Sequence, residues 1–158
     1  MSRGSYYTIE YKQPQVIILP ILDNRAIVMV RVYRPVIADN TLELPAGGAS
    51  RNELLVSAAV REFREETGIL ISDLKRFQML SPLVNMARSP TLPCIFQVHL
   101  VQQEYDLRMD HDHEVSSVEC FSYKKVLQKI EQGEIYMGLQ IAVIMRYFIS
   151  NQIIKQAE

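Results

Sequence analysis

The sequence predicts an α+β fold in which a mixed β-sheet is flanked by helices. Runs of strand-forming residues alternate irregularly with runs of helical period, and this order is typical of a mixed sheet covered by helices. The length of 158 residues fits one domain with its own apolar core. We therefore expect residues 1–158 to form a single domain.

Two strands are expected near the N-terminus. The runs VIILPIL at 16–22 and IVMVRVY at 27–33 flank the polar stretch DNRA, which is typical of a β-hairpin. Pro20 has no backbone N–H, so it favours an edge or bulged position for the first strand. The segment TLELP at 41–45 predicts a further short strand that ends at Pro45.

The segment 49–68 changes to helical period, with apolar residues three to four positions apart. Ser50 and Glu53 have the S-x-x-E spacing of a capping box, which places the helix start at this pair. Gly68 is positioned to end the helix in a left-handed cap. The sequence thus indicates an amphipathic helix with a signal at each end.

The second half of the chain predicts three strands, one irregular segment and two helices. The irregular segment contains several prolines and is a candidate substrate loop, and the helices are separated near Gly133. The expected strands are KRFQMLSPLV at 75–84, PCIFQVHLVQQ at 93–103 and SVECFSY at 117–123, the loop is NMARSPTLP at 85–93, and the helices are 123–134 and 137–150.

Composition and charge exclude some partners. With 17 basic and 18 acidic residues, the formal net charge of -1 gives no attraction toward nucleic acid or an anionic membrane. The longest apolar run is too short to cross a bilayer, and the N-terminus lacks the apolar core of a signal peptide. Cys94 and Cys120 lack metal-ligand spacing and are expected to be buried free thiols. We expect a cytoplasmic protein.

Three carboxylates are concentrated at the end of the predicted helix. Glu62, Glu65 and Glu66 fall within roughly 100° of arc at 3.6 residues per turn, so they repel one another on one patch. One interpretation is a solvated face neutralised by Arg61 and Arg64. The other is a site for a hard divalent cation, because oxygen clusters of this kind bind Mg²⁺ or Mn²⁺.

The wider spacing favours the cation site. From Gly47 to Ile69 the chain reads G-x5-E-x7-R-E-U-x-E-E-x-G-U, where U is apolar. This pattern resembles the complete signature of the Nudix hydrolases. The resemblance implies an α/β/α sandwich around a mixed sheet and metal-assisted hydrolysis of a nucleoside diphosphate linked to another group.

The resemblance also implies roles for residues of the signature. Glu62 and Glu66 would be direct metal ligands, Glu65 a ligand or a supporting carboxylate, and the backbone carbonyl of Ala46 a further ligand. Arg61 would orient the glutamates, and Glu53 would fix the preceding loop against the helix or simply cap it. The implied cofactor is Mg²⁺, with Mn²⁺ as an alternative.

Two further runs resemble the ADP-ribose pyrophosphatase and nucleotide-sugar branch of this family. They are RVYRP at 31–35 and ELPAGG at 43–48. On this resemblance Arg34 would contact the diphosphate or terminal ribose, and Glu43 substrate hydroxyls or the base. The loop at 81–90 departs from the branch, because Asn85, Arg88 and Ser89 replace its usual glycine and acidic residue.

The expected general base lies in the stretch DHDHEVSSVECF at 110–121. Similar enzymes supply a base from an acidic loop at this point, which implies Glu114, with Asp112 as the substitute. His111 and His113 could be zinc ligands, but without a third partner nearby they are better interpreted as solvated loop residues. His99 is most simply a strand residue.

The leading hypothesis is a Mg²⁺-dependent pyrophosphatase that converts ADP-ribose to AMP and ribose 5-phosphate. The alternatives are hydrolysis of another nucleotide sugar or a dinucleotide, and a nucleotide-sensing module without turnover. A homodimer is expected, although the arm before Val16 is shorter than the strand-bearing extension that related enzymes exchange. Tyrosines of SYYTIEY at 5–11 could pack on a partner or stack on an adenine.

Overall fold

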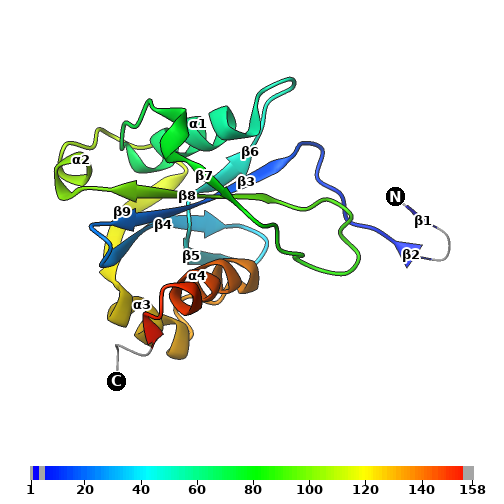
Figure 1. The fold of residues 1–158 in the computed structure, drawn as a ribbon. Helices are drawn as coiled ribbons and strands as arrows, with labels where there is room; N and C mark the ends of the chain where they lie inside the picture. The colour runs from blue at the N-terminus through cyan, green and yellow to red at the C-terminus, as the bar shows by residue number, and fades with distance from the viewer. Residues whose placement is uncertain (1, 4–5, 155–158) are drawn as a thin grey trace.

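The computed structural model describes residues 2–3 and 6–154 (Figure 1). The main strands and helices follow the order expected from the sequence. The strands are β1 Ser2–Arg3, β2 Tyr6–Tyr7, β3 Gln15–Leu22, β4 Ala26–Arg34, β5 Asp39–Glu43, β6 Ala46–Gly48, β7 Gln78–Leu80, β8 Cys94–Leu100 and β9 Val115–Ser122. The helices are α1 Leu55–Thr67, α2 Gln102–Asp106, α3 Tyr123–Glu131 and α4 Gly138–Ser150, with a 3₁₀ turn at Leu74–Arg76.

Seven of the strands form one mixed sheet. The strand order is β5-β4-β3-β8-β7, and β6 and β9 pair with β3 and β4 respectively. β3 and β8 are parallel, whereas the other pairs of this sheet are antiparallel. The predicted α+β class with a mixed sheet is therefore confirmed.

The two faces of the sheet bury separate apolar clusters. Because side chains alternate along a strand, β3 directs Val16 and Ile18 toward α1, and Ile17 and Leu19 toward α3 and α4. Figure 1 shows α1 on one face and α3 with α4 on the other, which gives the α/β/α layering. Phe63 anchors α1 in its cluster.

Of the two positions expected for Pro20, an edge strand or a bulge, the edge is wrong, because β3 lies inside the sheet between β4 and β8. The ladder between β3 and β4 covers only Ile21 and Leu22 of β3. Ile18, two residues before the proline, donates its N–H to Pro45 on the other side of this gap. The missing N–H of Pro20 therefore faces the point where β3 has left β4, and no ladder bond is lost.

Helix α1 begins later than the sequence predicts. Its N-cap is Leu54, which provides no side-chain cap, so the expected capping box at Ser50 and Glu53 does not start the helix. Those two residues instead close a separate turn, in which the Glu53 carboxylate accepts the backbone N–H of Ser50 at 2.7 Å. The C-terminal prediction is confirmed, since Gly68 has φ of 70° and donates its N–H to the Arg64 carbonyl.

The segment between β7 and β8 has no helix or strand, as predicted for residues 85–93. It lies beside the N-terminal arm, and the Ile9 N–H bonds the Arg88 carbonyl at 3.0 Å. The arm itself contains a small antiparallel ladder of β1 with β2, away from the main sheet (Figure 1). Among the described residues, the structure has no helix with the length and apolarity needed to span a bilayer.

Candidate active site

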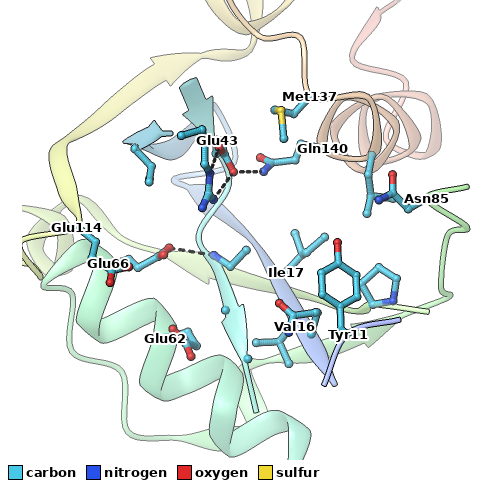
Figure 2. Close-up of a pocket in the computed structure, with 18 of the residues that line it drawn as sticks. Tyr11, Val16, Ile17, Glu43, Glu62, Glu66, Asn85, Glu114, Met137 and Gln140 are labelled. Atoms are coloured by element: carbon cyan, nitrogen blue, oxygen red, sulfur yellow. Dashed lines mark hydrogen bonds and ion pairs between the residues drawn. The ribbon is translucent and has the colours of Figure 1, made fainter. Parts of the chain in front are cut away.

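A pocket of about 520 Å³ opens where β6, the N-terminal end of β3 and the start of α4 meet (Figure 2). Carboxylates from three parts of the chain line it, together with one guanidinium and several apolar side chains. The lining residues are Tyr11, Gln15, Val16, Ile17, Val32, Arg34, Glu43, Ala46, Gly47, Gly48, Glu62, Glu66, Asn85, Pro93, Glu114, Met137, Gly138, Leu139 and Gln140.

Helix α1 brings Glu62 and Glu66 to this pocket because residues four apart share a helix face. The short strand β6 lies directly against them. The Ala46 N–H donates to Glu66 Oε2 at 2.9 Å, and a Cβ placed on Gly47 would overlap the Glu62 carboxylate. Glycine at position 47 is therefore what allows this carboxylate to lie against the strand backbone.

The pocket disfavours negative charge on Glu66. Burial is the main cause, and the nearby Glu62 adds to it, so that the pKa of Glu66 rises to about 8 despite the bond from Ala46. Glu66 is partly buried, and the charge of Arg34 offsets only part of the cost of its ionisation. Its environment is suited to an added positive charge.

Arg61 holds the other carboxylates of the signature in place. It donates to Glu53 through Nε and Nη2, each at 3.0 Å, to Glu62 at 2.8 Å, to Glu65 at 3.0 Å and to the Gly48 carbonyl at 2.9 Å. These five bonds use all five N–H groups of the guanidinium. The bonds that Arg61 donates to Glu53, followed by those to Glu62 and Glu65, raise the pKa of Arg61. Arg61 therefore joins α1 to β6. It is not among the described residues that line the pocket.

Glu65 points away from the pocket. Its side chain is 46% exposed and pairs with Arg61 one turn earlier, and the residue lines a shallow depression with Met109 and Asp112 instead. Glu65 therefore shares Arg61 with Glu62 but is not among the described residues that line the pocket with Glu62 and Glu66.

Arg34 at the end of β4 and Glu43 at the end of β5 form a bidentate pair that lines the pocket. Arg34 Nε and Nη2 each lie 2.8 Å from a different oxygen of Glu43. The Glu43 carboxylate is 2% exposed and also accepts the Thr41 hydroxyl and, at 2.9 Å, the Gln140 amide. Burial would raise the pKa of Glu43, but the bonds from Arg34, Thr41 and Gln140 hold it below its ordinary value.

Glu114 reaches the pocket from the loop before β9, a loop that is fixed to the end of α1. Met109 donates its N–H to the Gly68 carbonyl at 2.8 Å, and Asp112 donates its N–H to the Glu65 carbonyl at 2.7 Å. The Asp112 carboxylate accepts the Glu114 N–H at 3.3 Å. Asp112 thus shapes the turn, whereas Glu114 lines the cavity near Glu66 (Figure 2).

The remaining sequence candidates divide in two. Asn85 and Tyr11 line the pocket, so the loop and the arm both contribute to it. Arg88 is exposed and outside the lining, and Ser89 is buried, with its hydroxyl on the Thr91 carbonyl. Sequence reasoning missed Gln140, because a single glutamine in an apolar helix has no recognisable motif.

None of the three histidines is among the described residues that line the pocket. His99 contacts Asn24 and His111 the Asp112 carbonyl, which agrees with structural roles. Cys94 and Cys120 are free and partly buried.

The donor types of the pocket suit a hard divalent cation. Glu62 and Glu66 offer carboxylate oxygens on one helix face, and their mutual repulsion contributes to the raised pKa of Glu66, which an added cation would oppose. The described residues contain no group of three or more His, Cys, Asp or Glu side chains already close enough to enclose a metal ion. Water or substrate oxygens would have to complete a coordination shell around such a cation.

Fold and pocket together define a class of protein: an α/β/α sandwich whose helix-borne carboxylates face a cleft suited to phosphate chemistry. Residues 11–138 match the family profile described as NUDIX domain, which covers most of the chain. The chain belongs to the NUDIX family and is a Nudix-type pyrophosphohydrolase. Members of this family act on nucleoside diphosphate derivatives and typically depend on a divalent metal.

A solved structure titled "Crystal structure of ADP compounds hydrolase" is similar to this one, with a TM-score of 0.68. The alignment covers 90% of this chain and 76% of the other, at 19% sequence identity, so it shows a shared fold. No curated protein sequence matches this chain significantly.

Proposed function

We propose that this protein hydrolyses the diphosphate bond of ADP-ribose, giving AMP and ribose 5-phosphate. The observation that carries the proposal is one pocket lined both by the Glu62 and Glu66 pair of α1 and by the Arg34 guanidinium of β4. A nucleoside diphosphate linked to a sugar has phosphate charge for a cation held by the glutamates and for Arg34. The similarity of RVYRP and ELPAGG to the ADP-ribose pyrophosphatase branch supports this substrate.

In this proposal Glu62, Glu66 and the Ala46 carbonyl hold Mg²⁺ or Mn²⁺. The bound metal would neutralise phosphate charge and stabilise the leaving phosphate. Arg61 and Glu53 keep Glu62 against β6 through their ion pair. In the arrangement observed, Glu65 supports the site by sharing Arg61 with Glu62.

The organic parts of the substrate meet the other walls. Arg34 contacts the diphosphate or the terminal ribose, because its side chain is 43% exposed while Glu43 fixes one edge of it. Tyr11 offers an aromatic face for the adenine, and Asn85 offers an amide for hydroxyls or base edges. Arg88 lies outside the lining, so we do not assign it a substrate contact.

Glu114 is the proposed general base. It would take a proton from a water molecule as the water oxygen attacks one phosphorus, and the bond from that phosphorus to the bridging oxygen breaks. The bridging oxygen leaves with the other phosphate, so one water is consumed and two monophosphates form. Glu62 and Glu66 are assigned to the cation, so the base must come from another segment.

The test is a panel of nucleoside diphosphate derivatives incubated with Mg²⁺ or Mn²⁺, with products resolved by chromatography. AMP and ribose 5-phosphate from ADP-ribose, at a higher kcat/KM than for other nucleotide sugars and dinucleotides, would support the proposal. Preference for another compound would reassign the substrate. Nucleotide binding without products would indicate a sensing module.

Two variants make the panel specific to this pocket. Glu62→Gln and Glu66→Gln keep side-chain size but remove charge, so each should lower kcat by about a hundredfold or more with metal present. Unchanged turnover in either variant would rule out the carboxylate pair as the cation site.

The role of Glu114 predicts a contrast with Asp112. Glu114→Gln should lower kcat by roughly 10²–10⁴-fold with little change in substrate affinity, and activity should partly recover at high pH as hydroxide replaces the base. Asp112→Asn retains an oxygen that can accept the Glu114 N–H and should lose much less. Steady-state kinetics of both variants across pH would check this contrast. A severe loss in Asp112→Asn alone would transfer the role to Asp112.

A further inference from the structure

Gln140 connects helix α4 to the polar wall of the pocket. It lies in the first turn of α4, is 6% exposed, and uses both ends of its amide. Its Nε2 donates to Glu43 Oε2 at 2.9 Å (Figure 2), and its Oε1 accepts the backbone N–H of Leu44. These partners are 96 and 97 residues away in sequence. The amide therefore fastens α4 to the end of β5.

The Glu43 carboxylate is fully occupied by protein donors. Oε1 accepts Arg34 Nε and the Thr41 hydroxyl, and Oε2 accepts Arg34 Nη2 and the Gln140 amide. A carboxylate has about four lone-pair positions, so these four donors saturate it. Glu43 has no acceptor position left for a substrate hydroxyl.

Arg34 is only half used by the same network. Two of its N–H groups bind Glu43, while the other three have no hydrogen-bond partner among the described residues. It is also the only Lys or Arg among the described residues that line the pocket. The network therefore fixes one edge of the single pocket guanidinium and leaves the other edge available.

We propose that Gln140 is a positioning residue, which holds Glu43 so that Arg34 presents its free edge to an anionic phosphate group of the substrate. Glu43 is then a support for Arg34 rather than a substrate contact, which revises the role that sequence resemblance gave it. Thr41 is the second support and acts from β5 itself. This inference rests on the proposed function, since it concerns how that pocket binds a nucleoside diphosphate derivative.

The effect of removing Gln140 in proteins with and without the Arg34 guanidinium distinguishes a positioning role of Gln140 from general packing of α4. If Gln140 acts through Arg34, its removal matters only while the guanidinium is present. If it merely packs α4 on the sheet, the loss is the same with or without that guanidinium. A double-mutant cycle between positions 140 and 34 separates these two cases.

The experiment measures kcat and KM for Gln140→Leu, Arg34→Gln and the double variant, with the substrate that the panel identifies. We expect Gln140→Leu to raise KM about tenfold or more with kcat changed less than about threefold, because a binding group is misplaced. In the Arg34→Gln background the same substitution should change KM less than about twofold. Equal effects in both backgrounds would overturn the proposal.

Thr41→Val provides a second route, because Gln140→Leu also leaves the Leu44 N–H unpaired and could impair folding. Valine matches threonine in shape and removes the hydroxyl, which contacts Glu43 Oε1 and also lies 3.2 Å from the Val32 carbonyl, so KM should rise in the same Arg34-dependent way. An additive effect of Thr41→Val would contradict the proposal even if Gln140→Leu does not fold. Absence of any turnover in the wild-type protein would instead count against the proposed function, which keeps the two failures distinguishable.

Discussion

Glu66→Gln should stabilise the metal-free protein in alkaline solution while abolishing turnover. In the folded chain, burial and the neighbouring Glu62 raise the pKa of Glu66 from 4.5 to about 8. A group whose pKa is raised by folding stabilises the fold fully below its unfolded pKa, and this contribution is lost as pH rises toward the folded pKa. The metal-free wild type should therefore lose stability progressively between about pH 4.5 and pH 8.

The size of this effect follows from the displacement of the pKa. Each unit is worth about 1.4 kcal/mol, so the displacement sets a ceiling of about 5 kcal/mol. Because Glu66 lines an open pocket that water enters, the realistic figure is roughly 2–3 kcal/mol. Glutamine does not titrate and still offers an oxygen to the Ala46 N–H, so the variant avoids the loss.

Urea unfolding in the presence of a chelator, at pH 5 and at pH 9, measures the free energy of unfolding of both proteins. The variant should exceed the wild type by roughly 2–3 kcal/mol more at pH 9 than at pH 5. Glu65→Gln is the matched control, because it removes the same charge from an exposed position on the same helix. An equal difference at both pH values, or an equal response in the control, would refute the assignment of a costly buried charge to Glu66.

Two glycines give further predictions, each with a glycine control. Gly47→Ala should lower kcat/KM by at least about tenfold, because its Cβ overlaps the Glu62 carboxylate. Gly48→Ala should be milder, because its Cβ meets only flexible glutamine side chains. Steady-state kinetics of both variants would check this contrast, and equal losses would contradict it. Gly68→Ala should lower the free energy of unfolding in urea by roughly 2–4 kcal/mol, because the residue has positive φ and its added Cβ would overlap the backbone of Met109 in the loop. Gly133 also has positive φ, but its Cβ would enter open space, so Gly133→Ala should lower the same free energy by only about 1 kcal/mol. Similar costs at both sites would mean that the loop contact contributes little.

The sequence predicts the parts of the site that depend on local periodicity. Glu62 and Glu66 reach the pocket because a four-residue step returns to the same helix face, and Gly68 ends that helix because the backbone there turns left-handed. Strands β3 and β4 were also predictable, since their apolar runs are long, whereas the short β6 of Ala46–Gly48 has no such run and was not predicted. Spacing along one helix is enough to place these residues.

Other parts depend on competition between distant partners, which spacing does not encode. Glu65 is one residue before Glu66, which places it about 100° around the helix from Glu66, and its side chain is 46% exposed. The Glu53 carboxylate does accept the Ser50 N–H, as in a capping box, but the helix begins only at Leu55 and Arg61 binds the same carboxylate from within α1. Gln140 reaches Glu43 only through the packing of α4 on the sheet. Arg88 belongs to a segment without periodicity, so its direction could not be inferred.

The attachment of the Glu114 loop to the end of α1 affects the local unfolding of the site. A polar surface loop usually opens independently and at little cost in free energy, while the elements beneath it stay folded. Here the amides of Met109 and Asp112 are bonded to backbone carbonyls of the helix terminus, so the loop shares the helix's protection from solvent. Opening of the last turn of α1, which carries Glu66, would remove both of these acceptors and so free the loop that carries Glu114. We therefore expect amide hydrogen exchange at Met109 and Asp112 to be slower than in a loop without such bonds, and to quicken when the end of α1 is destabilised.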